Sequence, residues 1–92
     1  MIITTTSAVE GRPVKTYLGI VAGESFKLDD SYEGAAGKED TLLAARQAAL
    51  AKMTQRAEAL GANAIIGVSI DVEAQSAMKF IVTVAGTAVV IP

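Results

Sequence analysis

Alternating and helical hydrophobic patterns divide this chain into five elements. Apolar residues alternate with polar or small ones over Val14–Leu28 and over Ala64–Glu73, which predicts two long strands. Shorter β-branched or apolar stretches at Ile2–Thr6 and Met78–Ile91 predict two more strands. The stretch Asp40–Leu60 repeats with the helical period and predicts one long helix.

The residues at the ends of these elements sharpen the boundaries. Asp40 is a good N-cap, and Gly61 stands where a left-handed residue closes a helix. Asp29–Lys38 reads as a polar loop, and Ala74–Ala77 as the turn of a hairpin. The order β, β, α, β, β predicts one α+β domain over residues 1–92, with two layers: one long helix on a mostly antiparallel sheet.

Strict alternation assigns a face to each strand residue. We expect the core face to hold Ala64, Ile66, Val68, Ile70 and Val72 of the later strand, and Val14, Thr16, Leu18, Ile20, Ala22, Phe26 and Leu28 of the earlier one, interrupted by Glu24. The other face then carries small residues: Gly19, Gly23, Gly67, Ser69, Thr83, Ala85 and Thr87. Such a face either lets another backbone approach or lines a lumen, or it is a thinly covered solvent face; both interpretations stay open.

The helix has an apolar stripe and a smooth back. The stripe holds Leu42, Leu43, Ala49, Leu50, Met53, Ala57 and Leu60, and the back holds Ala44, Ala48, Ala51 and Ala59. The alanines either reflect helix propensity alone or form a subunit contact.

Arg46 is the anomaly of this helix, because it lies near the middle of the predicted core stripe. A guanidinium buried there requires a carboxylate, and Glu10, Glu24, Asp71 and Glu73 are candidates. An ion pair or a side chain extended to the layer edge is one interpretation, and anion binding is the other. If Arg46 is buried and paired, Arg46→Ala costs about 3–5 kcal/mol.

Composition favours self-association. Hydrophobic residues make up 51% of only 92 residues, the mean hydropathy is +0.41, and a domain this small has much surface to cover. We therefore expect subunits to cover part of it.

Charge and hydropathy bear on partners and location. The net charge is −2 without a basic stripe, which argues against nucleic-acid binding. The apolar runs are too short to span a membrane, and Met1–Thr6 lacks the features of a signal peptide, so we expect a cytoplasmic protein.

The chain has no cysteine and no histidine. It therefore offers no thiolate, no imidazole base and no soft metal ligand, and Ser7, Ser69 and Ser76 have no histidine partner for a hydrolase triad. We expect no enzyme, no cofactor, and no assignable catalytic, cofactor-binding or metal-binding residue.

Two clusters of acidic residues remain as candidates for a cation site or for acid–base chemistry. The acids of Asp29–Glu33 form either a solvated loop or a hard-cation site, although their spacing does not match an EF-hand. Asp71 and Glu73 share one strand face about 7 Å apart and form either a rim of charges or an acid–base pair. Gly19 and Gly23 do not form a phosphate loop, because no Lys-Ser/Thr follows them.

Three segments resemble the YbjQ-like family, small bacterial and archaeal proteins labelled as heavy-metal-binding. They are Met1–Thr6 with Val9-Glu10-Gly11, Tyr17–Glu24 and Leu60–Val68, and the ending Gly86–Ile91 and the helix pattern Ala45-Arg46 with Ala49 also fit. The resemblance implies a dodecin-like β/α/β2 subunit, a homopentameric ring and a framework role for Arg46. Ser25–Asp40 is shorter and more acidic than the family's segment there, which usually carries Gly-Gly-Arg-Ser before the helix.

Together these features predict a non-enzymatic homo-oligomer of unknown cellular role. The function we expect is the binding of a small ligand between subunits or in the lumen; the alternative is a metal or trace-element protein that uses carboxylates. Because soft ligands are missing, we expect no binding of Zn²⁺, Cu⁺ or Cd²⁺ tighter than about 10 µM.

Overall fold

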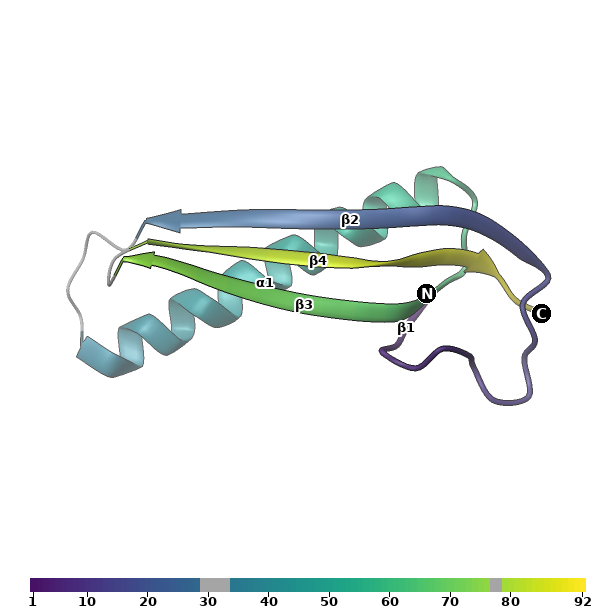
Figure 1. Ribbon diagram of the computed structural model, residues 1–92, viewed down its shortest axis with the longest axis horizontal. Helices are drawn as coiled ribbons and strands as arrows, with labels where there is room; N and C mark the ends of the chain where they lie inside the picture. Colours follow the sequence, from purple (N-terminus) through teal and green to yellow (C-terminus); the bar gives the residue numbers. More distant parts are fainter. Residues whose placement is uncertain (29–33, 77–78) are drawn as a thin grey trace.

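The computed structural model describes residues 1–28, 34–76 and 79–92. One long helix lies diagonally across one face of a four-stranded sheet (Figure 1). The elements follow the predicted order: β1 (Ile2–Ile3), β2 (Thr16–Leu28), α1 (Gly34–Ala59), β3 (Ala64–Ser76) and β4 (Lys79–Val90). The predicted two-layer α+β architecture is confirmed.

The sheet is mixed, with the order β1-β3-β4-β2. β4 pairs antiparallel with both β2 and β3, and the short β1 runs parallel to β3. β2 and β3 therefore run in the same direction on either side of β4, and α1 connects them (Figure 1). We call the side of the sheet that α1 covers the helix face and the other side the open face.

The helix begins earlier than predicted. It starts at Gly34, so Asp40 is not its N-cap and residues 34–38 are not a loop. Ala35, Ala36, Lys38 and Glu39 are good helix formers, and they outweigh the cost of Gly37.

The C-terminal end of the helix confirms the prediction for Gly61. Gly61 has φ +89°, and its N–H donates to the Glu58 carbonyl over 2.9 Å while the Ala62 N–H donates to the Ala57 carbonyl over 3.1 Å. These two bonds form a Schellman cap, which satisfies carbonyls that the helix end would leave free.

Two bulges overturn the predicted strand faces. The register of β2 shifts between Tyr17 and Gly19, and that of β3 shifts between Ile66 and Ser69. Gly19 has φ +124° and Gly67 has φ +61°, conformations that glycine adopts most readily. Each bulge inserts an extra residue, so the alternation changes face at that point.

In β2, Val21, Gly23 and Ser25 are buried under α1, whereas Ile20, Ala22 and Phe26 are exposed. The predicted even-numbered core face is therefore wrong beyond the bulge, and Gly23 does not lie on the open face.

In β3, the predicted single face is divided in two. Ala64 and Ile66 pack with Val89 and Ile91 in a cluster on the open face. Val68 belongs to the helix-face core, and Ile70 and Val72 pair with Val84 and Val82 of that same core. Ser69, Asp71 and Glu73, in contrast, lie on the open face as expected.

Small residues bring α1 close to the sheet. Among residues 42–59 of the helix, the fully buried ones are Ala45, Ala49, Met53 and Ala57. A Cβ placed on Gly23 would overlap the Ala49 carbonyl oxygen and lie 2.8 Å from the Met53 nitrogen, so the missing side chain permits this contact. The helix packs chiefly over β2 and β4.

The predicted helix stripe is therefore correct only in part. Ala49, Met53 and Ala57 are buried and Leu42 and Leu50 are half-buried, but Leu43 and Leu60 are exposed. Arg46 is also exposed, so the premise of the 3–5 kcal/mol loss on Arg46→Ala fails. The prediction followed the largest apolar side chains, whereas packing against Gly23 selects alanines.

Candidate functional site

The open face offers the chemistry that the helix face lacks. Its side chains come from alternate positions of three strands, and one row across the sheet joins Glu24, Thr83 and Asp71. Ser69 pairs with Ala85 and Glu73 with Ile81, so short polar and acidic groups cover the middle of this face. Asp71 and Glu73 are both exposed, on the shared face predicted for them.

One end of the open face is covered by the chain's own N-terminal segment. Ile2, Val9 and Val14 pack against the cluster of Ala64, Ile66, Val89 and Ile91. Backbone bonds hold the segment beside β3, from the Thr4 N–H to the Ile65 carbonyl and from the Gly67 N–H to the Thr6 carbonyl.

This segment forms a cavity of about 280 Å³ that is open to solvent. Its lining residues are Ile2, Thr4, Thr6, Ala8, Val9 and Glu10. The two threonine hydroxyls lie 2.8 Å apart, and the Thr6 hydroxyl also donates to the Ala8 carbonyl over 2.6 Å. The hydroxyls therefore have partners within the segment itself.

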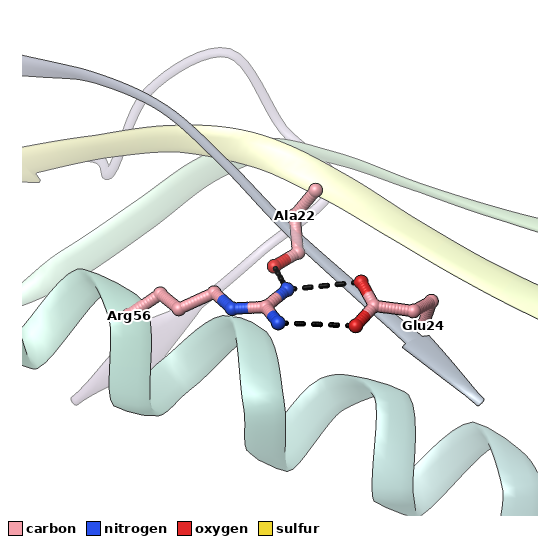
Figure 2. Close-up of polar contacts among 3 residues, drawn as sticks. All are labelled: Ala22, Glu24 and Arg56. Atoms are coloured by element: carbon pink, nitrogen blue, oxygen red, sulfur yellow. Dashed lines mark hydrogen bonds and ion pairs between the residues drawn. The ribbon is translucent and has the colours of Figure 1, made fainter.

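An ion pair at the outer edge of β2 is the one salt bridge found among the described residues (Figure 2). The Arg56 guanidinium reaches from α1 and donates to both carboxylate oxygens of Glu24, over 2.9 and 3.0 Å. It also donates to the Ala22 carbonyl over 2.8 Å. Such a bidentate pair has a fixed geometry, and here it covers a carbonyl of an edge strand.

This arrangement changes the affinity of both groups for protons. The hydrogen bonds from Arg56 are the largest cause and lower the pKa of Glu24. Desolvation opposes them, and the positive charges of Arg56 and Lys52 add to the lowering. The same pair raises the pKa of Arg56. Both side chains are about half exposed, so the pair is solvated and its contribution to stability is small.

The pair also corrects the interpretation of Arg46. Glu24 was one of its candidate partners, but Glu24 pairs with Arg56, ten residues further along the helix. Glu24, a charged residue within an apolar strand, was the sequence signal for a buried or edge ion pair. Because the predicted buried face of the helix was wrong, the sequence indicated Arg46 instead of Arg56 as the partner of Glu24.

Several predicted candidates are not brought together. The acidic segment Asp29–Glu33 lies outside the described residues. Ser7 and Ser69 are both exposed, and the side chain of Ser76 is also outside the described part. Within residues 1–28, 34–76 and 79–92 no group of three or more acidic, histidine or cysteine side chains could hold a metal ion. None of the helical residues described forms a stretch long and apolar enough to cross a membrane.

The sequence of this chain is similar to a known protein family. Residues 27–92 match the family model described as "Putative heavy-metal-binding". This chain belongs to the YbjQ-like family. The resemblance found in the sequence is thus confirmed, and the family is uncharacterised; none of these findings points to catalysis.

Full-length relatives support the assignment. A UPF0145 protein of Acetivibrio thermocellus is 45% identical over 105 aligned positions, and one of Clostridium kluyveri is 40% identical; each comparison covers 99% of both chains. The alignments are longer than the 92 residues of this chain, so the relatives carry residues at positions where this chain has none.

The fold also matches a solved structure. A crystal structure of a DUF74-family protein of unknown function from Pediococcus pentosaceus aligns with a TM-score of 0.77 and 25% identity, covering 100% of this chain and 98% of that one.

Proposed function

We propose that this YbjQ-like protein acts as a non-enzymatic ring of identical subunits that binds a small ligand. The observation that carries the proposal is the amount of large apolar surface the single chain leaves uncovered. Ile20 is 84% exposed, Tyr17 70% and Phe26 57%, and Leu43, Leu60, Ile70 and Val72 are also exposed. Single exposed apolar residues are ordinary, but so many on one small domain are typical of an interaction surface.

The number of subunits in this proposal is five. That number comes from the family resemblance, whereas the exposed apolar surface supports association without fixing its size. Light scattering on the purified protein should give a mass of roughly five times the 9.5 kDa monomer at micromolar concentration. A mass near that of one subunit would overturn the ring.

The ligand site in this proposal lies between subunits or in the lumen. The open face supports it, because a ring that turns this face inward surrounds its lumen with Ser69, Thr83 and Thr87 and with the acids Asp71 and Glu73. Native mass spectrometry tests it: an organic mass retained in stoichiometric amount supports ligand binding. If protein purified from its own organism retains no organic ligand and carries metal instead, the result would favour a cation-binding function.

The alternative is a protein that binds a hard cation. The supporting observation is that Asp71 and Glu73 share the open face and are exposed, so a ring would repeat the pair around its axis. Carboxylates converging in this way suit Ca²⁺, Mg²⁺ or Mn²⁺ better than Zn²⁺. Elemental analysis of the wild type and of Asp71→Asn/Glu73→Gln measures this: stoichiometric metal in the first and none in the second supports it.

The family's description concerns heavy metals, and this chain offers them neither thiolate nor imidazole. We therefore expect calorimetric titration with Zn²⁺ to show no site tighter than about 10 µM at neutral pH. A sub-micromolar site would contradict this expectation and favour a heavy-metal function.

A further inference from the structure

The most exposed large apolar side chain among those that the structure describes has an unusual position. Ile20 is 84% exposed and lies on β2, the edge strand at one side of the sheet. Its cross-strand row continues through Thr87 to Ile66, which is only 6% exposed under the N-terminal segment. The same apolar row is therefore covered on β3 and uncovered on β2.

The bulge at Gly19 is what places Ile20 on the open face. Without the extra residue between Tyr17 and Gly19, alternation would bring Ile20 to the helix face, where Val21 now packs. Tyr17 pairs with Val89, a member of the open-face cluster, and is 70% exposed. Tyr17 and Ile20 thus project together from the open face at the edge of β2.

A matching cavity lies at the opposite edge of the same face. Ile2 and Val9, which line it, also pack against the open-face cluster, so the cavity lies beside that cluster at the β1 edge of the sheet. Its volume is about 280 Å³, and an apolar cavity of about 150 Å³ already accepts a benzene molecule. Because the Thr4 and Thr6 hydroxyls are bonded within the segment, an apolar occupant leaves neither of them without a partner.

The chain cannot fill this cavity with its own Ile20. β4 and β3 separate β2 from β1, so the two edges lie about 14 Å apart at the usual strand spacing. An apolar projection and a pocket at different places on one molecule make a head-to-tail contact between copies, which closes into a ring when the rotation permits.

The Arg56–Glu24 pair favours side-chain insertion over simple extension of the sheet. Arg56 donates a hydrogen bond to the carbonyl of Ala22, two residues beyond Ile20. This carbonyl is therefore not free to pair with a second strand added to the edge of β2. The side chains of Tyr17 and Ile20 remain free to project beside it. Glu10, which lines the cavity, offers a carboxylate that can accept a hydrogen bond from the Tyr17 hydroxyl.

We propose that Ile20, with Tyr17 beside it, inserts into the cavity of Ile2, Thr4, Thr6, Ala8, Val9 and Glu10 of a second copy of this chain. The contact repeats from one subunit to the next, Ile20 of each filling the cavity of its neighbour. This proposal rests on the ring proposed above and assigns the surfaces that join its subunits.

The absence of native cysteine allows a direct test by cross-linking. The double variant Ile20→Cys/Ala8→Cys, treated with a mild oxidant, should form disulfides between subunits and give a ladder of dimers and larger species on a non-reducing gel. A reductant should abolish the ladder, and its largest member gives the number of subunits. The ladder reports only disulfides between subunits, because a disulfide within one chain leaves the mass of the monomer unchanged.

The matched control is Phe26→Cys/Ala8→Cys, because Phe26 is an exposed residue on the same strand and face. It should cross-link much less. Equal ladders from both variants, or no ladder from the first while the wild type has the mass of an oligomer, would overturn the assigned contact and leave the ring standing. A monomeric wild type would overturn both proposals.

A second pair of variants tests the cavity without touching Ile20. Ala8→Phe should fill the cavity from within and raise the dissociation constant between subunits about tenfold or more, since it displaces a buried apolar side chain. Ser7→Phe adds the same phenyl group at a neighbouring residue that does not line the cavity, and should leave the native mass of the oligomer unchanged. Circular dichroism confirms that both variants fold; equal native masses for the two folded variants would contradict the proposal.

Discussion

The two faces of one sheet show opposite relations between hydrophobicity and burial. On the helix face Ala49 is fully buried, whereas on the open face Ile20, a far larger apolar residue, is 84% exposed. The helix face is closed because glycine and alanine let two backbones meet. The open face is covered only where the N-terminal segment lies over it. Burial in the single chain thus follows how closely the backbones approach rather than how hydrophobic each residue is.

The largest effect should come from truncating a large side chain that α1 buries in the core of the helix face. Met53 is fully buried against the sheet, so Met53→Ala should lower the free energy of unfolding by about 4 kcal/mol through lost burial and a cavity. Chemical denaturation measures it. Phe26→Ala on the open face is the control and should change the stability of a subunit by less than about 0.5 kcal/mol; equal losses would erase the difference between the faces.

Gly23→Ala tests the close contact itself. The added methyl would overlap the Ala49 carbonyl and the Met53 nitrogen, both backbone atoms of α1. The helix must move away from β2, and we expect a loss of about 3 kcal/mol in the free energy of unfolding.

Gly86→Ala is the natural comparison for Gly23→Ala. Its Cβ would meet the Cγ2 methyls of Ile65 and Val68 at 2.7 and 2.9 Å, and the Ile66 carbonyl oxygen at 3.1 Å. Side-chain methyls can adjust more easily than helix backbone, so the loss should be nearer 1–2 kcal/mol, roughly. A greater loss for Gly86→Ala than for Gly23→Ala would contradict the role given to the helix backbone.

Gly67→Ala should have a smaller effect, because it tests the bulge without any steric contact. No atom lies within 4 Å of the added Cβ, but φ is +61°. The cost is that of a left-handed alanine, about 1 kcal/mol. Gly67→Asn, which tolerates this conformation better, should recover part of it. If Gly67→Ala is neutral in thermal denaturation, the bulge does not depend on the positive φ.

The order of elements could be predicted from the sequence because each element carries its own local signal. The period of Asp40–Leu60 gives the helix, and Gly61 gives its end, confirmed by the Schellman bonds. The faces of β2 and β3 could not be assigned by alternation, because one extra residue at Gly19 or Gly67 reverses every later position. An isolated glycine within a strand was the available signal for a bulge.

The ion pair needed information that the sequence does not contain locally. Whether Arg46 or Arg56 meets Glu24 depends on the rotation of α1 about its axis and on its position along β2, and both are set by the contact of Gly23 with Ala49 and Met53. The cavity likewise depends on how residues 2–10 fold back over β3, and no periodic pattern encodes that path.

The smallest expected effect is the pH dependence contributed by Glu24 at the boundary between the two faces. Arg56 lowers the pKa of Glu24 below the ordinary value of a glutamate, so the folded state favours the ionised carboxylate. The stabilisation is therefore present above the unfolded pKa and is lost as the pH falls through the lower, folded value. Glu24→Gln should melt slightly below the wild type near neutral pH, and the difference should shrink as the solution is acidified well below about pH 4. High salt should also reduce the difference, because both side chains are half exposed. A difference in melting temperature that is constant with pH would show that the charge of Glu24 does not stabilise this edge.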